Sequence, residues 1–462
     1  MKIVIIGGGP GGYVAAIRAA QLKAEVTLIE KEHIGGTCLN KGCIPTKVLL
    51  HTAGEFENVN KNFKDYGIKI AGAELDWEKL QKRKTKIVRK LVAGVDNLLK
   101  NNNVTKIMGM ASFINKNQLK VKVSGGAETI VDFDYAIIAT GSKPVIIPIP
   151  GVDLPGIITS DEALSLKEIP SSMVIIGGGV IGSEFAAVYS ALGCKVTIIE
   201  MLPNIVANMD QDIVKPIKEK FKKSGIEVYT NTKVVSISES AEGLSVNTIS
   251  DNKEQSFNAE KVLLSIGRKP VIDNLELENV SVETNRGAVI VNKNMQTNVP
   301  NIYAIGDVTA GVMLAHVASA EGIVAVESIM NKKPSIDFKT IPYCVYTKPE
   351  LAGVGLTEEQ AKEKGYDVKT GLFPMNINGK AMIEAEQEGL VKYIIDSATK
   401  EVLGLHMSGP SATELIVEGA LAVRLEATID EITSTIHAHP TVAESLHEAA
   451  HAVHKNAIHI PK

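Results

Sequence analysis

The stretch "VIIGGG" occurs twice in this chain, at Val4–Gly9 and again at Val174–Gly179, an offset of 170 residues. A second pair of segments keeps this offset, since "VTLIE" at Val26–Glu30 matches "VTIIE" at Val196–Glu200. Similarity at a fixed offset indicates a repeated supersecondary unit. The chain therefore contains two copies of one such unit.

Each copy reads as an apolar strand, a G-x-G-x-x-G turn, a helix, a second apolar strand and a terminal glutamate. One glycine turns the chain tightly, one lets the backbone approach a pyrophosphate, and one lets the helix pack closely on the strand. The helix N-terminus then offers free N–H groups to the phosphates. Glu30 and Glu200 follow the last glycine by 18 residues, where a carboxylate can accept hydrogen bonds from a ribose diol. The pattern predicts two dinucleotide sites, with Gly7, Gly9 and Gly12 in the first and Gly177, Gly179 and Gly182 in the second.

Two dinucleotide sites suggest two different dinucleotides, and electron transfer between a flavin and a nicotinamide is a natural reason for having both. Glu200 bears on which nicotinamide is bound, because its carboxylate would repel a 2′-phosphate. The "MLPNIV" that comes next supplies no Arg or Lys to neutralise such a phosphate. We therefore expect NAD rather than NADP.

The composition is that of an ordinary globular protein, with 45% hydrophobic and 22% charged residues. A chain of 462 residues is too long for one hydrophobic core, so about two to four domains are expected. The net charge of −4 argues against a nucleic-acid surface, and we interpret the basic run Glu78–Lys90 as the solvated face of a helix. No apolar run reaches the roughly 18 residues that a membrane span needs. The N-terminus enters a strand pattern directly, and we expect a cytoplasmic protein.

Two of the four cysteines, Cys38 and Cys43, lie in "GGTCLNKGCIPTK". Cytosolic disulfides are usually transient or catalytic, which favours a redox role for this pair. A zinc clip would need a second pair of ligands, whereas Cys194 and Cys344 are isolated. Residues five apart in a regular helix are too distant for a disulfide, and Gly42 gives the backbone freedom to bring them together. A helix that begins near Cys38 would also lower the pKa of a thiol there.

A thiol switch needs a base, and "IHAHPTVAESLHE" supplies candidates, including His437 and His439. Pro440 suits the first position of a helix, which would place His439 at the helix mouth with Glu444 about one turn inside. Glu444 could then orient one ring nitrogen of His439 and leave the other free to face a thiol.

Other features have competing interpretations. Asp307 ends the apolar strand of "NIYAIGDV", where its carboxylate could hold a ribityl hydroxyl of a flavin or simply cap a turn. The segment from about Ile341 alternates strands and helices without glycine motifs, which indicates a separate unit for an interface or a substrate. A metal face on the C-terminal helix is less favoured than an exposed or interface face, because no Cys or acid ligand set lies beside its histidines, His447, His451 and His454.

Taken together, "GGTCLNKGCIPTK", the two G-x-G-x-x-G units, "AIGDV" and "HAHPTVAE" resemble the flavin-dependent pyridine nucleotide-disulfide oxidoreductases, essentially from end to end. The resemblance implies an α/β fold with two Rossmann-like dinucleotide-binding domains and a C-terminal α+β interface domain, in a homodimer. The implied domains are an FAD-binding domain at 1–145, an NAD-binding domain at 146–270, a central domain completing the FAD site at 271–340, and a dimerisation domain at 341–462.

The resemblance also implies roles for single residues. Cys38 would exchange with the substrate and Cys43 would stack on the flavin. His439 with Glu444 would be the base, reaching the dithiol of the other subunit. FAD would lie on the first glycine motif with Glu30, and NAD on the second with Glu200. Lys47 would lie near the flavin, with Glu184 as its ion-pair partner. The further contacts implied with FAD are Gly109, Asp307 and Ala315. Those implied with NAD are Val234 and Gly267. No metal is expected.

Within this family the chain is most similar to members that oxidise protein-bound dihydrolipoamide through a redox-active disulfide, FAD and NAD. The implied partner is the lipoyl-bearing protein of a 2-oxoacid dehydrogenase, an acetoin system or glycine cleavage. A glutathione reductase would call for NADP, and a mercuric reductase for a cysteine pair after Cys344, where no cysteine occurs. A flavoprotein oxidase or a nicotinamide-sensing scaffold gives no reason for both cysteines. Lys41 stands between the cysteines where the family often has valine.

Overall fold

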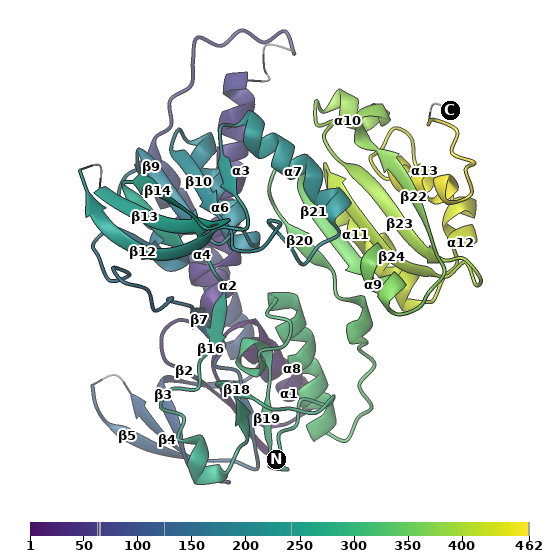
Figure 1. The fold of residues 1–462 in the computed structure, drawn as a ribbon. Helices are drawn as coiled ribbons and strands as arrows, with labels where there is room; N and C mark the ends of the chain where they lie inside the picture. The colour runs from purple at the N-terminus through teal and green to yellow at the C-terminus, as the bar shows by residue number, and fades with distance from the viewer. Residues whose placement is uncertain (62, 64–65, 124, 242, 461–462) are drawn as a thin grey trace.

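The first sheet is built around the first of the two repeated units. The computed structural model describes residues 1–460 except 62, 64, 65, 124 and 242. Seven strands run in the order β19-β6-β1-β2-β3-β4-β5. β1 pairs in parallel with β2 and β6, and β19, from far along the chain, adds in parallel to β6 (Figure 1). The elements are β1 Lys2–Ile6, α1 Pro10–Gln21, β2 Glu25–Glu30, β3 Thr105–Asn115, β4 Gln118–Val123, β5 Glu128–Asp132, β6 Tyr135–Ile138 and β19 Ile302–Ala304.

The second sheet repeats the unit. Its five strands run β11-β10-β9-β15-β8, and β9 pairs in parallel with β10 as β1 does with β2. An antiparallel sheet, β12-β13-β14, lies against it, and the short strands β7 and β16 pair with each other between the two units. The elements are β7 Ser142–Pro144, β8 Ile157–Thr159, α5 Ser160–Ala163, β9 Ser172–Ile176, α6 Val180–Ala191, β10 Lys195–Ile199, α7 Gln211–Lys223, β11 Glu227–Tyr229, β12 Lys233–Ser240, β13 Gly243–Ser250, β14 Lys253–Ala259, β15 Lys261–Leu264 and β16 Arg268–Pro270.

The C-terminal part forms its own lobe around an antiparallel sheet, in the order β20-β21-β24-β23-β22 (Figure 1, yellow-green). α11 packs on β21 and β24, and α13 on β22 and β23, which confirms the expected α+β character. The elements are β20 Tyr343–Val345, β21 Glu350–Gly355, α9 Glu358–Glu363, β22 Val368–Pro374, α10 Gly379–Ile383, β23 Leu390–Asp396, β24 Val402–Gly409, α11 Ala412–Arg424, α12 Ile429–Ser434 and α13 Glu444–Val453.

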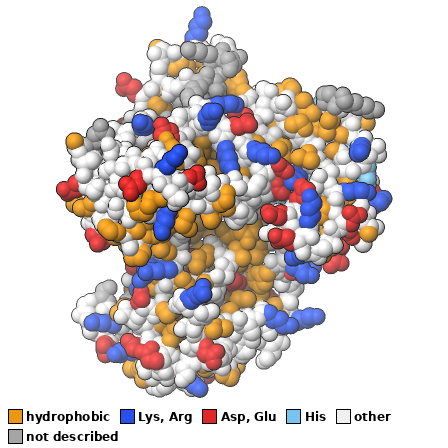
Figure 2. Space-filling view, in the orientation of Figure 1, with side chains coloured by type: hydrophobic (Ala, Val, Ile, Leu, Met, Phe, Trp, Pro, Cys, Tyr) orange, Lys and Arg blue, Asp and Glu red, His pale blue; other side chains and the backbone are white. Residues whose placement is uncertain are grey.

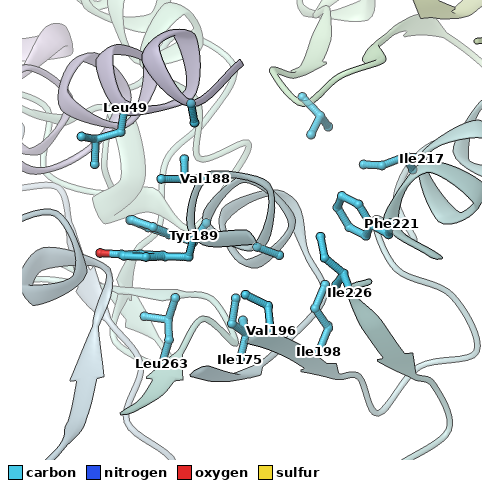
Figure 3. Packing of buried hydrophobic residues seen from close by; sticks show 14 of the residues in the cluster. Leu49, Ile175, Val188, Tyr189, Val196, Ile198, Ile217, Phe221, Ile226 and Leu263 are labelled. Carbon is cyan, nitrogen blue, oxygen red and sulfur yellow. The ribbon is translucent and has the colours of Figure 1, made fainter. Parts of the chain in front are cut away.

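The short helix α2 (Gly36–Lys41) follows the first unit and packs on α3 and α4, and α3 (Cys43–Lys61) packs on α6 of the second unit. In Figure 3, Leu49 of α3 lies beside Val188 and Tyr189 of α6, which in turn cover the second sheet. All three side chains are fully buried in one apolar cluster. This contact fixes the helix that begins at Cys43 against the second nucleotide unit.

The long helix α4 (Trp77–Asn101) confirms our interpretation of the basic run Glu78–Lys90 as a largely exposed helix face. Lys84 is an exception, because it is buried and its ammonium donates to the Leu164 carbonyl. None of the described helices is long and apolar enough to cross a membrane. The remaining elements are β17 Thr284–Asn285, β18 Ala288–Val289, α8 Ala315–Ile329 and the 3-10 helices η1 Leu277–Val280, η2 Gly306–Thr309, η3 Phe338–Thr340 and η4 Met375–Ile377.

A cavity of about 2040 Å³ is lined by both nucleotide units and by the C-terminal lobe. Figure 2 shows hydrophobic side chains gathered in the hollow between the lower lobe and the rest of the molecule. Both glycine loops, the cysteine pair and the start of α8 line this cavity. The fold therefore brings the sequence motifs to one place.

Candidate active site

The two glycine loops have the same geometry. Gly7 has φ +111°, which a residue with a side chain rarely adopts, and a Cβ on Gly12 would lie 1.8 Å from the Gly7 carbonyl oxygen. In the second loop Gly177 has φ +104°, and a Cβ on Gly182 would lie 2.0 Å from the Gly177 oxygen. The tight turn and the close helix–strand packing are present in both copies.

Glu30 and Glu200 each brace their own glycine loop. Glu30 Oε2 accepts a hydrogen bond from the Gly8 N–H at 2.6 Å, and Glu200 Oε2 accepts one from the Gly178 N–H at 2.6 Å. The other oxygen of each carboxylate accepts from the N–H two residues further on, at 2.6 and 2.7 Å. Because a carboxylate has about four acceptor positions, each can still accept from a ribose hydroxyl.

The start of each nucleotide helix offers unoccupied hydrogen-bond donors. Gly9 and Gly179 are the N-cap residues of α1 and α6, and neither helix start has a side-chain cap. A Cβ on Gly179 would meet no heavy atom within 4 Å, and one on Gly9 would come no nearer than 3.9 Å to Gly36. This open space beside free N–H groups fits a pyrophosphate at each loop.

The cysteine pair lies where two helices meet. α2 begins at Gly36, near Cys38 as expected, and ends at Lys41. Gly42 then breaks the helix with φ −145° and ψ −114°, and the longer helix α3 begins at Cys43 itself. The break brings the two thiols within hydrogen-bonding reach of each other.

The two thiols differ in acidity. The hydrogen bond from Cys38 lowers the pKa of Cys43 to about 7, and the positive charge of Lys47 adds to this although burial opposes it. The same hydrogen bond, together with burial, raises the pKa of Cys38. Near neutral pH the thiolate is therefore on Cys43.

The cation beside Cys43 is held by parts of all three lobes. The Nζ of Lys47 lies 2.7 and 2.9 Å from the two carboxylate oxygens of Glu184, which is buried on α6. Glu184 Oε1 also accepts from the Tyr346 N–H at 3.1 Å, and Lys47 Nζ lies 4.5 Å from the centre of the Tyr346 ring. The sequence motifs did not identify Tyr346, since nothing in its local pattern indicates a partner so far along the chain.

The Asp307 carboxylate lines the cavity and bonds to another element instead of capping its own turn. It accepts a hydrogen bond from the Ser142 hydroxyl at 2.5 Å, and Arg268 Nε donates to the same hydroxyl oxygen at 2.8 Å. Ser142 and Arg268 begin the paired strands β7 and β16. The sequence analysis did not identify Ser142 or Arg268 as site residues. Each follows a glycine turn, and neither stands at a fixed spacing from a recognised motif.

Four other expected cofactor contacts, Gly109, Val234, Gly267 and Ala315, also line the cavity. Ala315 begins α8, so that helix directs its N-terminus there. Gly109 has a packing reason as well, because a Cβ on it would lie 2.7 Å from the Lys122 carbonyl oxygen on the neighbouring strand.

His439 and Glu444 form a pair, with 2.9 Å between Nδ1 and Oε1. The prediction that a helix begins at Pro440 is wrong, because α13 begins at Glu444. A turn intervenes, in which the Thr441 hydroxyl donates to the Ala438 carbonyl at 2.6 Å and the Thr441 N–H donates to Glu444 Oε2 at 2.9 Å. Burial raises the pKa of Glu444, but the hydrogen bonds from Thr441 and His439 outweigh it and leave that pKa lowered.

This pair does not reach the dithiol of its own chain. The His439 side chain is 80% exposed and is not among the residues that line the cavity. Figure 1 shows α13 at the outer side of the C-terminal lobe, away from α2. Within one chain the structure therefore separates the expected base from the cysteines.

The helix face that carries His447 and His451 is turned largely onto its own chain. His447 Nε2 lies 3.1 Å from the Thr433 carbonyl oxygen of α12 and 3.2 Å from His451 Nε2. Both side chains nevertheless remain partly exposed, and the expectation of an exposed or interface face stays a prediction for them. Over the part of the chain that is described, no three or more His, Cys, Asp or Glu side chains are placed to hold a metal ion.

Comparison with known proteins gives consistent matches along the chain. Residues 1–322 match the profile of the pyridine nucleotide-disulphide oxidoreductases, and residues 341–450 match the dimerisation domain of the same family. A dihydrolipoyl dehydrogenase of Bacillus subtilis is 43% identical over 99% of this chain and 98% of its own length. Dihydrolipoyl dehydrogenase 1 of Arabidopsis mitochondria (Arabidopsis thaliana) is 42% identical over 99% of this chain and 91% of its own.

Two solved structures resemble the fold. LpdA from Mycobacterium tuberculosis has a TM-score of 0.90 at 27% identity, covering 97% of this chain and 99% of that one. The HOCl-induced flavoprotein disulfide reductase RclA from Escherichia coli has a TM-score of 0.86 at 31% identity, covering 96% of this chain and 98% of that one.

Proposed function

This chain belongs to the pyridine nucleotide-disulphide oxidoreductase family, and we propose that it oxidises protein-bound dihydrolipoamide to lipoamide and reduces NAD+. The electrons pass through a Cys38–Cys43 disulfide and FAD. Support comes from relatives described as dihydrolipoyl dehydrogenases, similar over nearly the whole chain. The observation that carries the proposal is the dithiol, with its acidic Cys43 beside Lys47 and Glu184 in a cavity that both nucleotide loops line.

The chain's own residues carry the thiol chemistry. His439 takes a proton from one thiol of dihydrolipoamide, and the resulting thiolate attacks the sulfur of Cys38. The Cys38–Cys43 bond breaks, and Cys43 leaves as a thiolate stabilised by Lys47. The second substrate thiol then attacks the mixed disulfide, which forms lipoamide and releases Cys38; Cys38 takes up the proton of this second thiol, and His439 keeps the proton of the first. Glu444 keeps the His439 ring oriented during the transfer.

The cofactor contacts follow from the loops. We assign FAD to Gly7, Gly9, Gly12 and Glu30, with Lys47, Gly109, Asp307 and Ala315 around the rest of it, and NAD to Gly177, Gly179, Gly182, Glu200, Val234 and Gly267. All of these line the cavity except Gly12 and Gly182, which pack against the first glycine of their own loops. A bound FAD would supply the two-electron chemistry that connects the dithiol to hydride transfer to NAD+. Glu200 disfavours a 2′-phosphate, and Glu184 holds the Lys47 ammonium in place.

We propose that the base acts across a homodimer. A dimerisation domain matches the C-terminal lobe, and the lobe presents an apolar face to solvent. Val417 and Leu421 on α11 and Leu425 directly after it follow one another at four-residue spacing and are exposed, and Ile436, three residues before the base, is 95% exposed. An exposed apolar face of this kind marks an association surface. A second copy seated on it would supply His439 to the dithiol of the first.

The partner and the cellular setting follow from the proposed reaction. The substrate arm would arrive on a lipoyl-bearing protein of a 2-oxoacid dehydrogenase, acetoin or glycine cleavage system. Four cysteines in 462 residues do not form a structural disulfide framework, and a transient, catalytic disulfide suits a reducing compartment, so we propose a cytoplasmic location. We retain the division into 1–145, 146–270, 271–340 and 341–462 as a proposal, with β19 of the third segment completing the sheet of the first.

Rapid-mixing reduction of the FAD-loaded protein tests the proposal. Dihydrolipoamide should reduce the wild-type flavoprotein with a long-wavelength charge-transfer band from the Cys43 thiolate. Cys38→Ser and Cys43→Ser should lose reduction by dihydrolipoamide and keep reduction by NADH. Full lipoamide turnover in either variant would refute the scheme.

A further inference from the structure

The chain crosses between the two nucleotide units at a pair of short strands whose polar side chains have no role in the proposed mechanism. It leaves the first unit through β7 and returns through β16, and the two strands pair antiparallel between the units (Figure 1). Backbone hydrogen bonds from the Val145 and Val271 N–H groups, at 3.0 and 2.9 Å, extend this pairing at its two ends. We call residues 141–145 and 267–271 the crossing.

Arg268 holds Ser142 across the crossing with two donors of its planar guanidinium. Its Nε donates to the Ser142 hydroxyl oxygen at 2.8 Å, and its Nη2 donates to the Ser142 carbonyl oxygen at 2.8 Å. The Ser142 hydroxyl has one proton, which it donates to Asp307 Oδ2 at 2.5 Å. Because the Arg268 N–H occupies a lone pair of the same oxygen, it orients this proton toward Asp307. The contacts thus form a relay from the return strand of the second unit to Asp307 of the first.

The guanidinium also lies close to charges of the second unit and of the dithiol helices. Asp161, on α5, lines the cavity together with Arg268. Burial raises the pKa of the Asp161 carboxyl, and the positive charges of Lys41 and Arg268 oppose this rise. Lys41 Nζ lies 3.8 Å from Asp161 Oδ2. Arg268 therefore lies where the two units meet the helix that carries Cys38.

The two ends of the relay coincide with proposed cofactor contacts. Gly267, which we assign to NAD, directly precedes Arg268, and Asp307 is assigned to FAD. Reacting groups must approach to about 3–3.5 Å, and a displacement of about 1 Å can slow such a step about 100-fold. A contact that fixes the crossing relative to Asp307 can therefore control the rate of hydride transfer between the two cofactors.

We propose that Arg268 is a positioning residue, which through Ser142 sets the placement of the nicotinamide unit relative to the FAD site. The inference rests on the proposed assignment of FAD to Asp307 and of NAD to the second glycine loop. The dithiol has separate anchors in Lys47 and Glu184. Loss of the relay should therefore slow the nicotinamide half-reaction and spare the thiol half-reaction.

Single-turnover reduction of the FAD-loaded dimer at saturating NADH tests this. Arg268→Met should lower the limiting rate about 10- to 100-fold, and should leave the half-saturating NADH concentration and reduction by dihydrolipoamide within about threefold. The slowed step should show the full isotope effect of NADH that carries deuterium at the transferred position. Ser142→Ala should lower the same rate about three- to tenfold, because the Nη2 contact with the backbone remains. Arg268→Met/Ser142→Ala should be no slower than Arg268→Met, since both changes break one relay.

Hydrogen exchange of the same FAD-loaded dimer gives a measurement independent of activity. Arg268→Met should speed exchange of the Val145 and Val271 amides and leave the amides of α3 unchanged. Lys269→Met is the matched control, because it removes an equal charge from the next residue of β16, whose exposed side chain points to the other side of the strand. It should leave both half-reactions and the exchange rates unchanged.

The inference is overturned if Arg268→Met keeps the wild-type limiting rate with NADH, or if Lys269→Met slows that rate equally. It is also overturned if the reductions by NADH and by dihydrolipoamide slow alike. Ser142→Ala decides the question if Arg268→Met does not fold or bind FAD, since an unchanged rate with NADH in that variant contradicts the relay. If the wild-type protein is reduced by NADH and not by dihydrolipoamide, the proposed function fails instead, and the comparison with NADH still decides the inference.

Discussion

The two nucleotide units match in their loops and differ in the segment after their second strand. In both, the terminal glutamate accepts from the glycine loop at 2.6 Å and the third glycine packs against the first. After Glu30 the chain enters α2 and α3 with their dithiol, whereas after Glu200 it enters a loop, "MLPNIVANM", without a titratable side chain. The loops therefore supply nucleotide binding, and the segment after the second strand decides which unit performs thiol chemistry.

The largest effects are expected where a Cβ would collide with backbone. Gly12→Ala would place a Cβ 1.8 Å from the Gly7 carbonyl oxygen, and FAD affinity should fall by more than about 100-fold, measured from flavin absorbance of the purified protein. Gly182→Ala should instead leave a yellow protein that NADH no longer reduces. If Gly182→Ala also lost FAD, the two glycine loops would not bind their nucleotides independently of each other, which would contradict the proposed assignment.

The second unit is joined to the C-terminal lobe by buried charge, which gives the next largest effect. Lys392 on β23 is 3% exposed and pairs with Asp210 at 3.1 Å, Asp212 at 2.7 Å and Glu358 at 2.7 Å. Lys392→Met should lower the free energy of unfolding by about 3–5 kcal/mol in urea titration, because Asp210 remains buried without its cation. Lys392→Met/Asp210→Asn should recover part of this loss, and no recovery would contradict the pairing.

The same network of charges should make the free energy of unfolding depend on pH. Hydrogen bonds from Lys215 and Lys392 lower the pKa of Asp212, and burial opposes them. The stability that Asp212 contributes is therefore fully present above its unfolded-state pKa and is lost as the pH falls through the lowered folded-state pKa. Lys392→Met should flatten this acid-side loss in thermal unfolding followed from about pH 7 to pH 3.

The thiol chemistry of the first unit should depend on one cation. Lys47→Met should raise the pKa of Cys43 above about 7, so that the thiolate fraction near neutral pH falls by up to about tenfold. The pH dependence of Cys43 alkylation measures this. Lys41→Met is the matched control, because the Lys41 ammonium bonds to Glu32 at 3.0 Å and not to the sulfurs. An equal shift in both variants would count against Lys47 as the specific cause.

The smallest effect concerns nucleotide choice. Glu200→Gln keeps the side-chain shape and removes the charge that repels a 2′-phosphate, so the preference for NADH over NADPH should fall by about fivefold. Glu30→Gln removes the equivalent charge from the first unit and should leave this preference unchanged. Reduction of the flavin by the two nucleotides compares them directly.

Local sequence predicted the parts of the site that are local. The glycine spacing and the glutamates at its end determine the loop geometry within about 25 residues. Gly42 was predicted to give the backbone freedom between the two cysteines, and the structure places a break between two helices there. The prediction of a helix start at Pro440 was wrong because proline is also compatible with the turn found there, which hydrogen bonds of Thr441 and Glu444 close.

The rest depended on contacts between distant segments. Tyr346, Ser142 and Arg268 reach the site only through packing of separate sheets, and no spacing in the sequence relates them to the cysteines. Periodicity placed His447, His451 and His454 on one face of α13, but it could not predict that His447 also contacts the Thr433 carbonyl oxygen of the adjacent helix α12.

The contact between α3 and α6 limits how such proteins can be recombined. Leu49 follows Lys47 and Cys43 on α3, and it packs on Val188 and Tyr189 four and five residues after Glu184 on α6 (Figure 3). A chimera that takes its nicotinamide unit from a relative would therefore inherit one half of a packed helix pair and one half of an ion pair. Exchanging α3 together with α6, rather than cutting at the sequence boundary between the units, should give the functional hybrids.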